Sequence, residues 1–242
     1  MPVMKILDLT LPSPQQNLAC DEALIDFCEE GFDHEILRFW EPTEHFVVLG
    51  YSNKISQEVN HLSCRESGVP VLRRPSGGGT VLQGPGCVNF SLVLKMETRP
   101  GLKSIRETNE FVLARHKKAL ESALKREIHI QGTSDLALGT LKFSGNAQRR
   151  KRRFVLFHGT FLLNFDIAQI ERFLPMPTQQ PTYRQNRTHR EFLTNLSAPK
   201  GLIQETIQEV WEAKDAFGDI PLEKIKKLEQ EKYSRDEWNF KF

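Results

Sequence analysis

The sequence has few of the features that mark membrane and secreted proteins. Among its 242 residues, no apolar run approaches the roughly 18 residues of a membrane-spanning helix. Residues 1–9 alternate as a strand does and lack the apolar core of a signal peptide. The four cysteines (Cys20, Cys28, Cys64, Cys87) form no C-x-x-C pair, which argues against a zinc site or a disulfide framework. The sequence therefore predicts a cytoplasmic protein without a membrane span.

An excess of one charge sign is absent as well. With 33 Lys and Arg against 31 Asp and Glu, the net charge is only +2, which argues against nucleic-acid binding by bulk electrostatics. Hydrophobic residues make up 39% and charged residues 26%, values that are typical of a soluble globular protein. Positive charge is concentrated only at residues 149–153 (RRKRR), and a run of this kind is most often a solvated turn.

Strand-like and helical segments interleave irregularly along the chain. Helices are expected over 14–30, with Ser13 as N-cap, and over 104–125, with Ile105 as the first residue of its apolar face. A third is expected over 56–67, and two more, over 201–217 and 222–232, close the chain. Because the turns between the expected strands are short, the sequence predicts an α/β protein of the α+β type. Its sheet should be mixed and largely antiparallel, with flanking helices.

The residues after the expected strand at 69–74 are the most unusual in the sequence. Arg73 and Arg74 end the strand, and three consecutive glycines follow at Gly77, Gly78 and Gly79. Glycine triplets cost chain entropy and pack no side chain, so something is expected to approach the backbone there. Bare amides beside two guanidinium groups favour a carboxylate or a phosphate. The spacing fits neither a P-loop nor a dinucleotide-binding motif, because strand-forming residues follow the glycines.

A second unusual segment places a lysine inside an expected strand. Alternation puts Lys142 on one face with Ser144, and Gly145 follows as though room were kept for a ligand. Asp135, before the turn, is placed to meet Lys142 across a hairpin, or to bind the ribose or the metal of a nucleotide. An anion cradle plus a strand lysine suits carboxylate activation, since the ammonium can stabilise charge beside an α-phosphate.

Four blocks of the chain, in order, resemble the lipoate–protein ligase A family. They are residues 73–81 (RRPSGGGTV), 134–135 (SD), 142–147 (KFSGNA) and 157–166 (FHGTFLLNFD). The resemblance implies the fold shared by biotin and lipoyl ligases and class II synthetase catalytic domains. It divides the chain into a catalytic domain over residues 1–199 and a helical extension over 200–242, packed on the same domain.

The resemblance also implies a reaction and the residues that carry it. Lipoate and ATP would give enzyme-bound lipoyl-AMP, and the lipoyl group would pass to a lysine of a carrier domain. Mg²⁺ would accompany ATP, with Asp135 as its candidate ligand, and Lys142 would be catalytic. The expected nucleotide and acyl-adenylate site comprises Arg73, Arg74, Ser76, Gly77, Gly78, Gly79, Thr80, Val81, Leu82, Asp135, Gly145, His158 and Gly159. For the acyl wall, the candidates are Trp40, Leu49 and Val81.

This chain departs from the family pattern in two places. Where the family has a histidine after the glycines, this chain has Gln83, which can form hydrogen bonds but cannot titrate. The small C-terminal domain of the family has no counterpart, since residues 200–242 are too few to form it. Either a separate small accessory subunit is then expected to complete the enzyme, or the chain performs part of the chemistry.

Two alternatives stay open at this point. Octanoyl and lipoyl amidotransferases share the fold and move the acyl group through a cysteine thioester without ATP. Cys87, the one thiol near the glycine loop, would be the nucleophile, although a buried structural cysteine is the more common case. A non-catalytic lipoate-binding protein is the third reading, and the presence of both Lys142 and Asp135 argues against it.

The implied partners are lipoyl carrier domains. These are acyltransferase subunits of 2-oxoacid dehydrogenases or the glycine-cleavage H protein, and no nucleic acid or membrane is implied. Because such carrier domains are commonly acidic, residues 149–153 form a candidate turn that steers the acceptor by electrostatics. A solvated turn is the alternative for these five residues.

Overall fold

The computed structural model describes residues 4–242 and contains two β-sheets. The main sheet has eight strands in the order β11-β1-β2-β6-β10-β9-β8-β7, and the small sheet has three in the order β4-β3-β5. The main-sheet strands are β1 (Met4–Asp8), β2 (Glu35–Trp40), β6 (Cys87–Lys95), β7 (His129–Gln131), β8 (Asp135–Leu138), β9 (Leu141–Arg150), β10 (Phe154–Leu162) and β11 (Asp215–Ala216). Those of the small sheet are β3 (Phe46–Leu49), β4 (Val71–Arg73) and β5 (Val81–Gln83).

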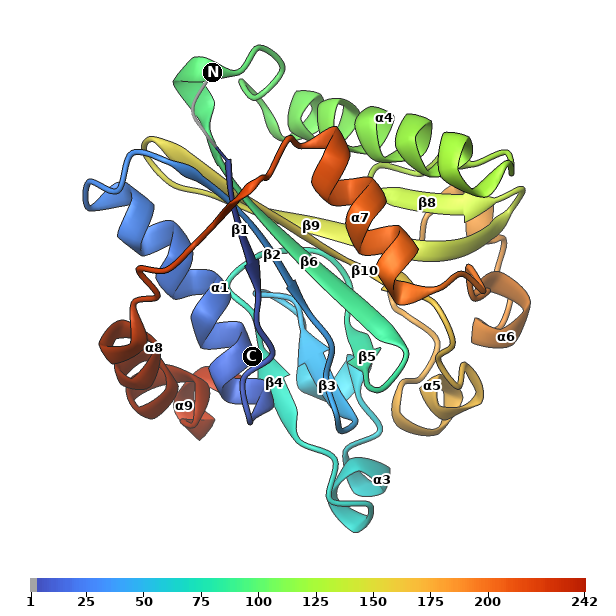
Figure 1. Ribbon diagram of the computed structural model, residues 1–242. Helices are drawn as coiled ribbons and strands as arrows, with labels where there is room; N and C mark the ends of the chain where they lie inside the picture. The colour runs from blue at the N-terminus through green and yellow to red at the C-terminus, as the bar shows by residue number, and fades with distance from the viewer. Residues whose placement is uncertain (1–3) are drawn as a thin grey trace.

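Helices cover both faces of the main sheet, as Figure 1 shows. One face carries α4 and α7, and the other carries α1, α8 and the small sheet. The helices are α1 (Pro14–Glu29), α2 (Ile55–Glu58), α3 (His61–Glu66), α4 (Ile105–Leu124), α5 (Ala168–Phe173), α6 (His189–Phe192), α7 (Lys200–Val210), α8 (Leu222–Leu228) and α9 (Asp236–Asn239). The chain also contains a 3-10 turn at Thr182–Arg184 and a π turn at Glu229–Tyr233.

The expected mixed and largely antiparallel sheet is confirmed. β11, β1 and β2 pair in parallel, whereas β2, β6, β10, β9, β8 and β7 pair in antiparallel fashion. β1 begins at Met4, and residues 1–3 of the expected strand lie outside the described residues. No helix within residues 4–242 is both long and apolar enough to span a bilayer.

Serine side chains cap the N-termini of the two long helices, α1 and α4. The hydroxyl of Ser13 accepts a hydrogen bond from the Gln16 amide, and that of Ser104 accepts one from the Glu107 amide, so both helices begin at the expected caps. Ile105 was expected on the buried face of α4, but its position in the first turn leaves it exposed.

The helix expected over residues 56–67 is broken into α2 and α3. Val59 has an extended backbone between them, and its β-branched side chain packs in the small-sheet core. The Asn60 side chain then accepts a hydrogen bond from the Ser63 amide and caps α3.

Residues 200–242 pack against both faces of the sheet. α7 places Ile203 and Ile207 in the core beneath α4, whereas α8 and the turn after it pack on α1. The stretch expected as purely helical also adds β11 beside β1. The domain boundary at residue 199 stays a prediction.

Candidate functional site

The glycine loop runs from β4 to β5 and is held by hydrogen bonds from Arg74, a buried residue. Nη2 of Arg74 donates to the carbonyls of Gly77 at 2.7 Å and Gly79 at 2.8 Å, and its Nε donates to Oγ of Ser76 at 3.1 Å. Gly78 has a φ of +89°, a conformation that suits glycine. The guanidinium of Arg74 therefore shapes the loop from inside, where burial lowers its pKa to about 10.

Arg73 does not face the loop, contrary to the expectation of two guanidinium groups around an anion. Its side chain is fully buried and donates to the backbone carbonyls of Gly50, Tyr51 and Asn53, and to those of Trp238 and Asn239. Strand residues alternate in direction, so two consecutive arginines point to opposite sides. Arg73 thus ties the C-terminal segment to β4.

Gly50, just after β3, has no side chain, and the glycine loop can therefore pack closely against its backbone. A Cβ on Gly50 would lie 2.1 Å from the carbonyl oxygen of Gly78 and 2.4 Å from Oδ1 of Asn53. By contrast, a Cβ on Gly77 or Gly79 would meet nothing within 4 Å. The sequence reading missed Gly50, because a single glycine at a strand end gives no sign of which backbone approaches it.

The loop is joined to strand β10 through a serine–histidine pair. Oγ of Ser76 and Nε2 of His158 are hydrogen-bonded at 2.6 Å. Burial, helped by the charge of Arg74, lowers the pKa of His158 to about 4, so the ring is neutral near pH 7. A neutral imidazole at this position can orient Ser76 without adding charge beside a bound anion.

Lys142, Asp135 and Tyr183 form the polar centre of the second segment. Nζ of Lys142 lies 2.8 Å from Oδ1 of Asp135, and the hydroxyl of Tyr183 donates to Oδ2 of Asp135 at 2.7 Å. A Cβ on Gly145 would lie 2.8 Å from Nζ of Lys142, so this glycine makes room for the lysine. The Lys142 ammonium is thereby held in place near the N-terminal end of β9.

Strand alternation predicted that Lys142 and Ser144 lie on the same face, and a β-bulge in β9 makes this prediction wrong. Ser144 pairs with Leu136 and Lys142 with Ala137, so Phe143 is an extra residue in β9. The extra residue shifts the alternation and places Lys142 on the side of Gly145 rather than that of Ser144.

A mostly apolar cavity of about 130 Å³ adjoins Lys142. Val81, Leu82, Phe143, Leu162, Leu174 and Phe192 supply apolar wall. Oγ1 of Thr80, also in the wall, is buried and has no hydrogen-bond partner among residues 4–242. Of the three residues expected to line the acyl chain, Val81 lies in the wall of this cavity, whereas Trp40 and Leu49 pack in the cores around the small sheet.

Gln83 takes part in a closed hydrogen-bond cycle beside the cavity. Its Nε2 donates to Oγ1 of Thr160 at 2.7 Å, Thr160 donates to Oδ1 of Asn89 at 2.5 Å, and Asn89 returns a hydrogen bond to Oε1 of Gln83 at 3.1 Å. Gln83 and Asn89 are buried. The amide therefore fixes the cavity wall without a titrating group.

Gly159 was expected to help complete the pocket, but it lies against the Asn146 side chain instead. A Cβ there would lie 1.9 Å from Oδ1 of Asn146, and the next contact is with Phe90 in the core beneath α4. The glycine therefore admits the Asn146 side chain, which donates to the carbonyl of Ser134 at 2.8 Å.

None of the four thiols is placed for nucleophilic chemistry. Cys20, Cys28, Cys64 and Cys87 are all buried. Burial raises the pKa of Cys87 to about 12, and its side chain packs in the core around the small sheet instead of lining the cavity. The alternative nucleophile is therefore shielded in this structure, in contrast to the partly exposed setting of reactive cysteines.

Asp135, the candidate magnesium ligand, is already engaged by protein groups. Both carboxylate oxygens of Asp135 are taken by Lys142 and Tyr183. Within residues 4–242, no cluster of three or more His, Cys, Asp and Glu residues could hold a metal. The Asp135 carboxylate therefore does not fit the metal-ligand role expected of it unless it leaves these partners.

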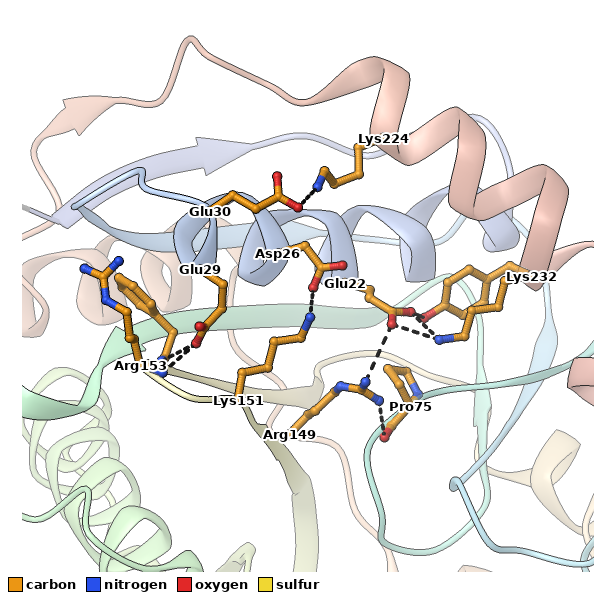
Figure 2. Close-up of polar contacts among 12 residues, drawn as sticks. Glu22, Asp26, Glu29, Glu30, Pro75, Arg149, Lys151, Arg153, Lys224 and Lys232 are labelled. Carbon is orange, nitrogen blue, oxygen red and sulfur yellow. Dashed lines mark hydrogen bonds and ion pairs between the residues drawn. The ribbon is translucent and has the colours of Figure 1, made fainter.

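Three of the basic residues 149–153 form contacts inside the molecule, and Figure 2 shows Arg149 beside Glu22 and Pro75 and Lys151 beside Asp26. Lys151 bonds to Asp26, and Arg153 contacts Asp33 at 3.1 Å. Arg149 donates to the carbonyl of Pro75 at 3.1 Å and lies 3.9 Å from Glu22. Three of the five cations are thus engaged within the molecule, which weighs against the hypothesis that this segment steers the acceptor.

Comparison with known proteins gives a family match over most of the chain. The model described as "Lipoyl protein ligase A/B catalytic domain" matches residues 13–215. A relative from Aeropyrum pernix, whose name assigns it provisionally to lipoate-protein ligase A, is 35% identical over 70% of this chain. The chain spans only 61% of that relative's length. Octanoyltransferase LipM of Lysinibacillus sphaericus is 27% identical, with 95% of each chain covered.

Solved structures share the fold at low identity. One is described as a bi-partite lipoate protein ligase and its E2 lipoyl domain from Thermoplasma acidophilum. It matches with a TM-score of 0.83 at 20% identity, covering 99% of this chain and 97% of that one. A lipoate-protein ligase A bound with ATP matches with a TM-score of 0.78 at 21% identity, covering 99% and 98%. These likenesses confirm the expected fold.

Proposed function

Because this chain belongs to the lipoyl protein ligase A/B catalytic domain family, we propose that it is an ATP-dependent lipoate–protein ligase. In the first step, a carboxylate oxygen of lipoate attacks the α-phosphorus of ATP, which gives lipoyl-AMP and releases pyrophosphate. In the second, the ε-amine of a carrier-domain lysine attacks the acyl carbonyl, which forms an amide and releases AMP.

The observation that carries this proposal is the ammonium of Lys142, which Asp135 holds in the wall of the apolar cavity. Held by Asp135, it is placed to stabilise negative charge where the acyl carboxylate and the α-phosphate meet. The loop amides around Gly77 and Gly79, where nothing crowds the backbone, would bind phosphate oxygens. Catalysis would then rest mainly on positioning and electrostatics.

ATP-independent octanoyl or lipoyl transfer is the second candidate, supported by the full-length match to Octanoyltransferase LipM. That chemistry needs a thiolate within reach of the acyl carbonyl. The burial of all four thiols weighs against it and favours the ligase.

We propose lipoyl carrier domains as acceptors and a separate small accessory subunit as a further partner, in the cytoplasm. The description of the Thermoplasma acidophilum structure as bi-partite, with its E2 lipoyl domain, supports both partners. The acceptors would be acyltransferase subunits of 2-oxoacid dehydrogenases or the glycine-cleavage H protein.

The experiment that tests the proposal is intact-mass analysis of a purified lipoyl domain incubated with this protein and lipoate. We expect a gain of one lipoyl group that requires ATP with Mg²⁺. Transfer from an acylated carrier in the absence of ATP would replace the ligase with the transferase. If neither reaction occurs, the assay is repeated with a small accessory subunit added.

A further inference from the structure

A buried guanidinium in the cavity wall has no carboxylate partner. Arg184 is 5% exposed and lines the cavity. Its Nε donates to the carbonyl of Arg187 at 3.0 Å, its Nη2 lies 3.5 Å from Sδ of Met176, and its Cζ lies 4.8 Å from the ring centre of Phe192. Within residues 4–242, Nη1 has no hydrogen-bond partner and no carboxylate lies within 4 Å of the guanidinium.

A buried charge without a counter-ion is costly, because protein offers less solvation than water. Desolvation lowers the pKa of Arg184, yet a guanidinium stays protonated near neutral pH. The carbonyl and sulfur contacts that it makes do not neutralise it. An anionic ligand in the cavity would do so, and a planar guanidinium suits a carboxylate in particular.

The other ionisable groups of the cavity wall do not supply that anion. Lys142 is already paired with Asp135 at 2.8 Å. Burial lowers the pKa of His189, whose Nε2 lies 3.1 Å from the Pro175 carbonyl, so it is neutral near pH 7. Glu58 accepts a hydrogen bond from Thr178 at 2.5 Å and forms no ion pair with Arg184. Arg184 is thus the uncompensated cation of this wall.

The residues around Arg184 in the chain link it to the segment that carries Lys142. The residue before it, Tyr183, bonds Asp135, the partner of Lys142. Arg187, which shares three hydrogen bonds with Arg184, also donates to the Thr140 carbonyl in the turn before β9. The uncompensated cation is therefore tied to the same end of β9 as the proposed catalytic lysine.

We propose that Arg184 receives the carboxylate of a free medium-chain acid and so makes this cavity select acids over neutral amides and thioesters. The inference rests on the proposed function for the identity of the acid but not for the presence of the subsite. Arg184 holds the carboxylate before adenylation, and the apolar wall takes the chain.

Calorimetric binding of octanoate and octanamide to the full chain tests the subsite without turnover. The two probes have the same chain length and differ in head-group charge. We expect octanoate to bind about 10- to 100-fold more tightly, the range of a charge-assisted hydrogen bond. Equal affinity in the wild-type protein would overturn the proposal.

Arg184→Met keeps an unbranched apolar stem beside Phe192 and removes the charge. The preference for octanoate should then fall to within about twofold of equality. The matched control is Arg190→Gln, which removes one positive charge from an exposed position paired with Glu171. It should leave the preference unchanged.

A folded Arg184→Met variant that keeps the full preference would assign the carboxylate to Lys142 and leave Arg184 as a support for Phe192. If that variant does not fold, Arg184→Lys decides. Loss of the two-pronged geometry should lower the preference several-fold, and an unchanged ratio would sink the proposal. Because binding is measured without ATP, the result stands apart from whether the protein forms an adenylate.

Discussion

Nζ of Lys142 lies 2.8 Å from Oδ1 of Asp135, across the hairpin of β8 and β9. The bulge at Phe143 and the missing side chain of Gly145 together permit this ion pair. The ammonium is therefore held ready before any substrate binds. Such preorganisation reduces the reorganisation needed when charge develops in the transition state.

Lys142→Ala should lower the rate of adenylate formation by about 100-fold or more, the usual cost of removing a group that stabilises transition-state charge. The measurement is lipoate-dependent exchange of pyrophosphate into ATP. Lys118→Ala, on the exposed surface of α4, is the matched control and should exchange at the wild-type rate. Wild-type exchange by the Lys142 variant would remove the lysine from the mechanism.

The parts of this site that the sequence predicts are those whose residues lie close together along the chain. Lys142, Asp135 and Gly145 lie within eleven residues, so a hairpin pattern was enough to bring them together. Tyr183 bonds Asp135 from 48 positions away, and no local pattern indicates that contact. Arg73 was misassigned because a buried structural arginine and a ligand-binding one look alike in a sequence.

The fold followed from sequence where local chemistry decides it. Ser13 and Ser104 mark helix starts through their own hydroxyls. The break at Val59 did not follow, because it depends on packing against the small sheet. The pairing of Lys151 with Asp26 was likewise hidden, since the two residues meet only through tertiary structure.

Gly50→Ala should destabilise the protein, because the new methyl group would meet the Gly78 carbonyl. A clash of this kind costs about 1–3 kcal/mol, which corresponds to a fall in Tm of about 2–12 °C for a chain of this size. Gly77→Ala is the matched control, since its Cβ would meet nothing within 4 Å. Thermal unfolding followed by circular dichroism compares them, and equal Tm values would contradict the close approach.

Stability should depend on pH through His116, which is fully buried between α4 and the end of α7. Nε1 of Trp211 donates to its Nε2 at 2.8 Å, and burial lowers the pKa of His116 to about 3. The unfolded residue, with a pKa near 6.5, binds more protons in the window between these values. The free energy of unfolding should therefore fall as pH drops from about 6.5 towards about 3, by up to about 1.4 kcal/mol per pH unit.

Urea unfolding at about pH 7 and about pH 5 measures this effect. His116→Gln keeps an acceptor for Trp211 and cannot titrate, so its loss of stability over the same interval should be smaller. Carboxylates contribute equally in both proteins and cancel in the comparison. Identical losses in the two proteins would mean that His116 becomes charged without unfolding.

Lys151→Ser should lower stability by about 1 kcal/mol, since Lys151 bonds Asp26 in a partly exposed pair. Arg152→Ser, an exposed residue of the same turn, is the control and should have no effect on stability. Neither change should alter the KM for a carrier domain. A rise in that KM with Arg152→Ser, reversed at low salt, would revive electrostatic steering by the turn.

Thiol chemistry gives the sharpest separation between ligase and transferase. Because burial raises the pKa of Cys87 to about 12, the group is a neutral thiol near pH 7. Ellman's reagent should therefore titrate no thiol in the folded protein and four after denaturation. Cys87→Ala should keep acyl transfer to a carrier domain within about threefold, since only packing is lost. A loss of about 1,000-fold, with Tm preserved, would instead make Cys87 the nucleophile and require an opening that brings it to the acyl group.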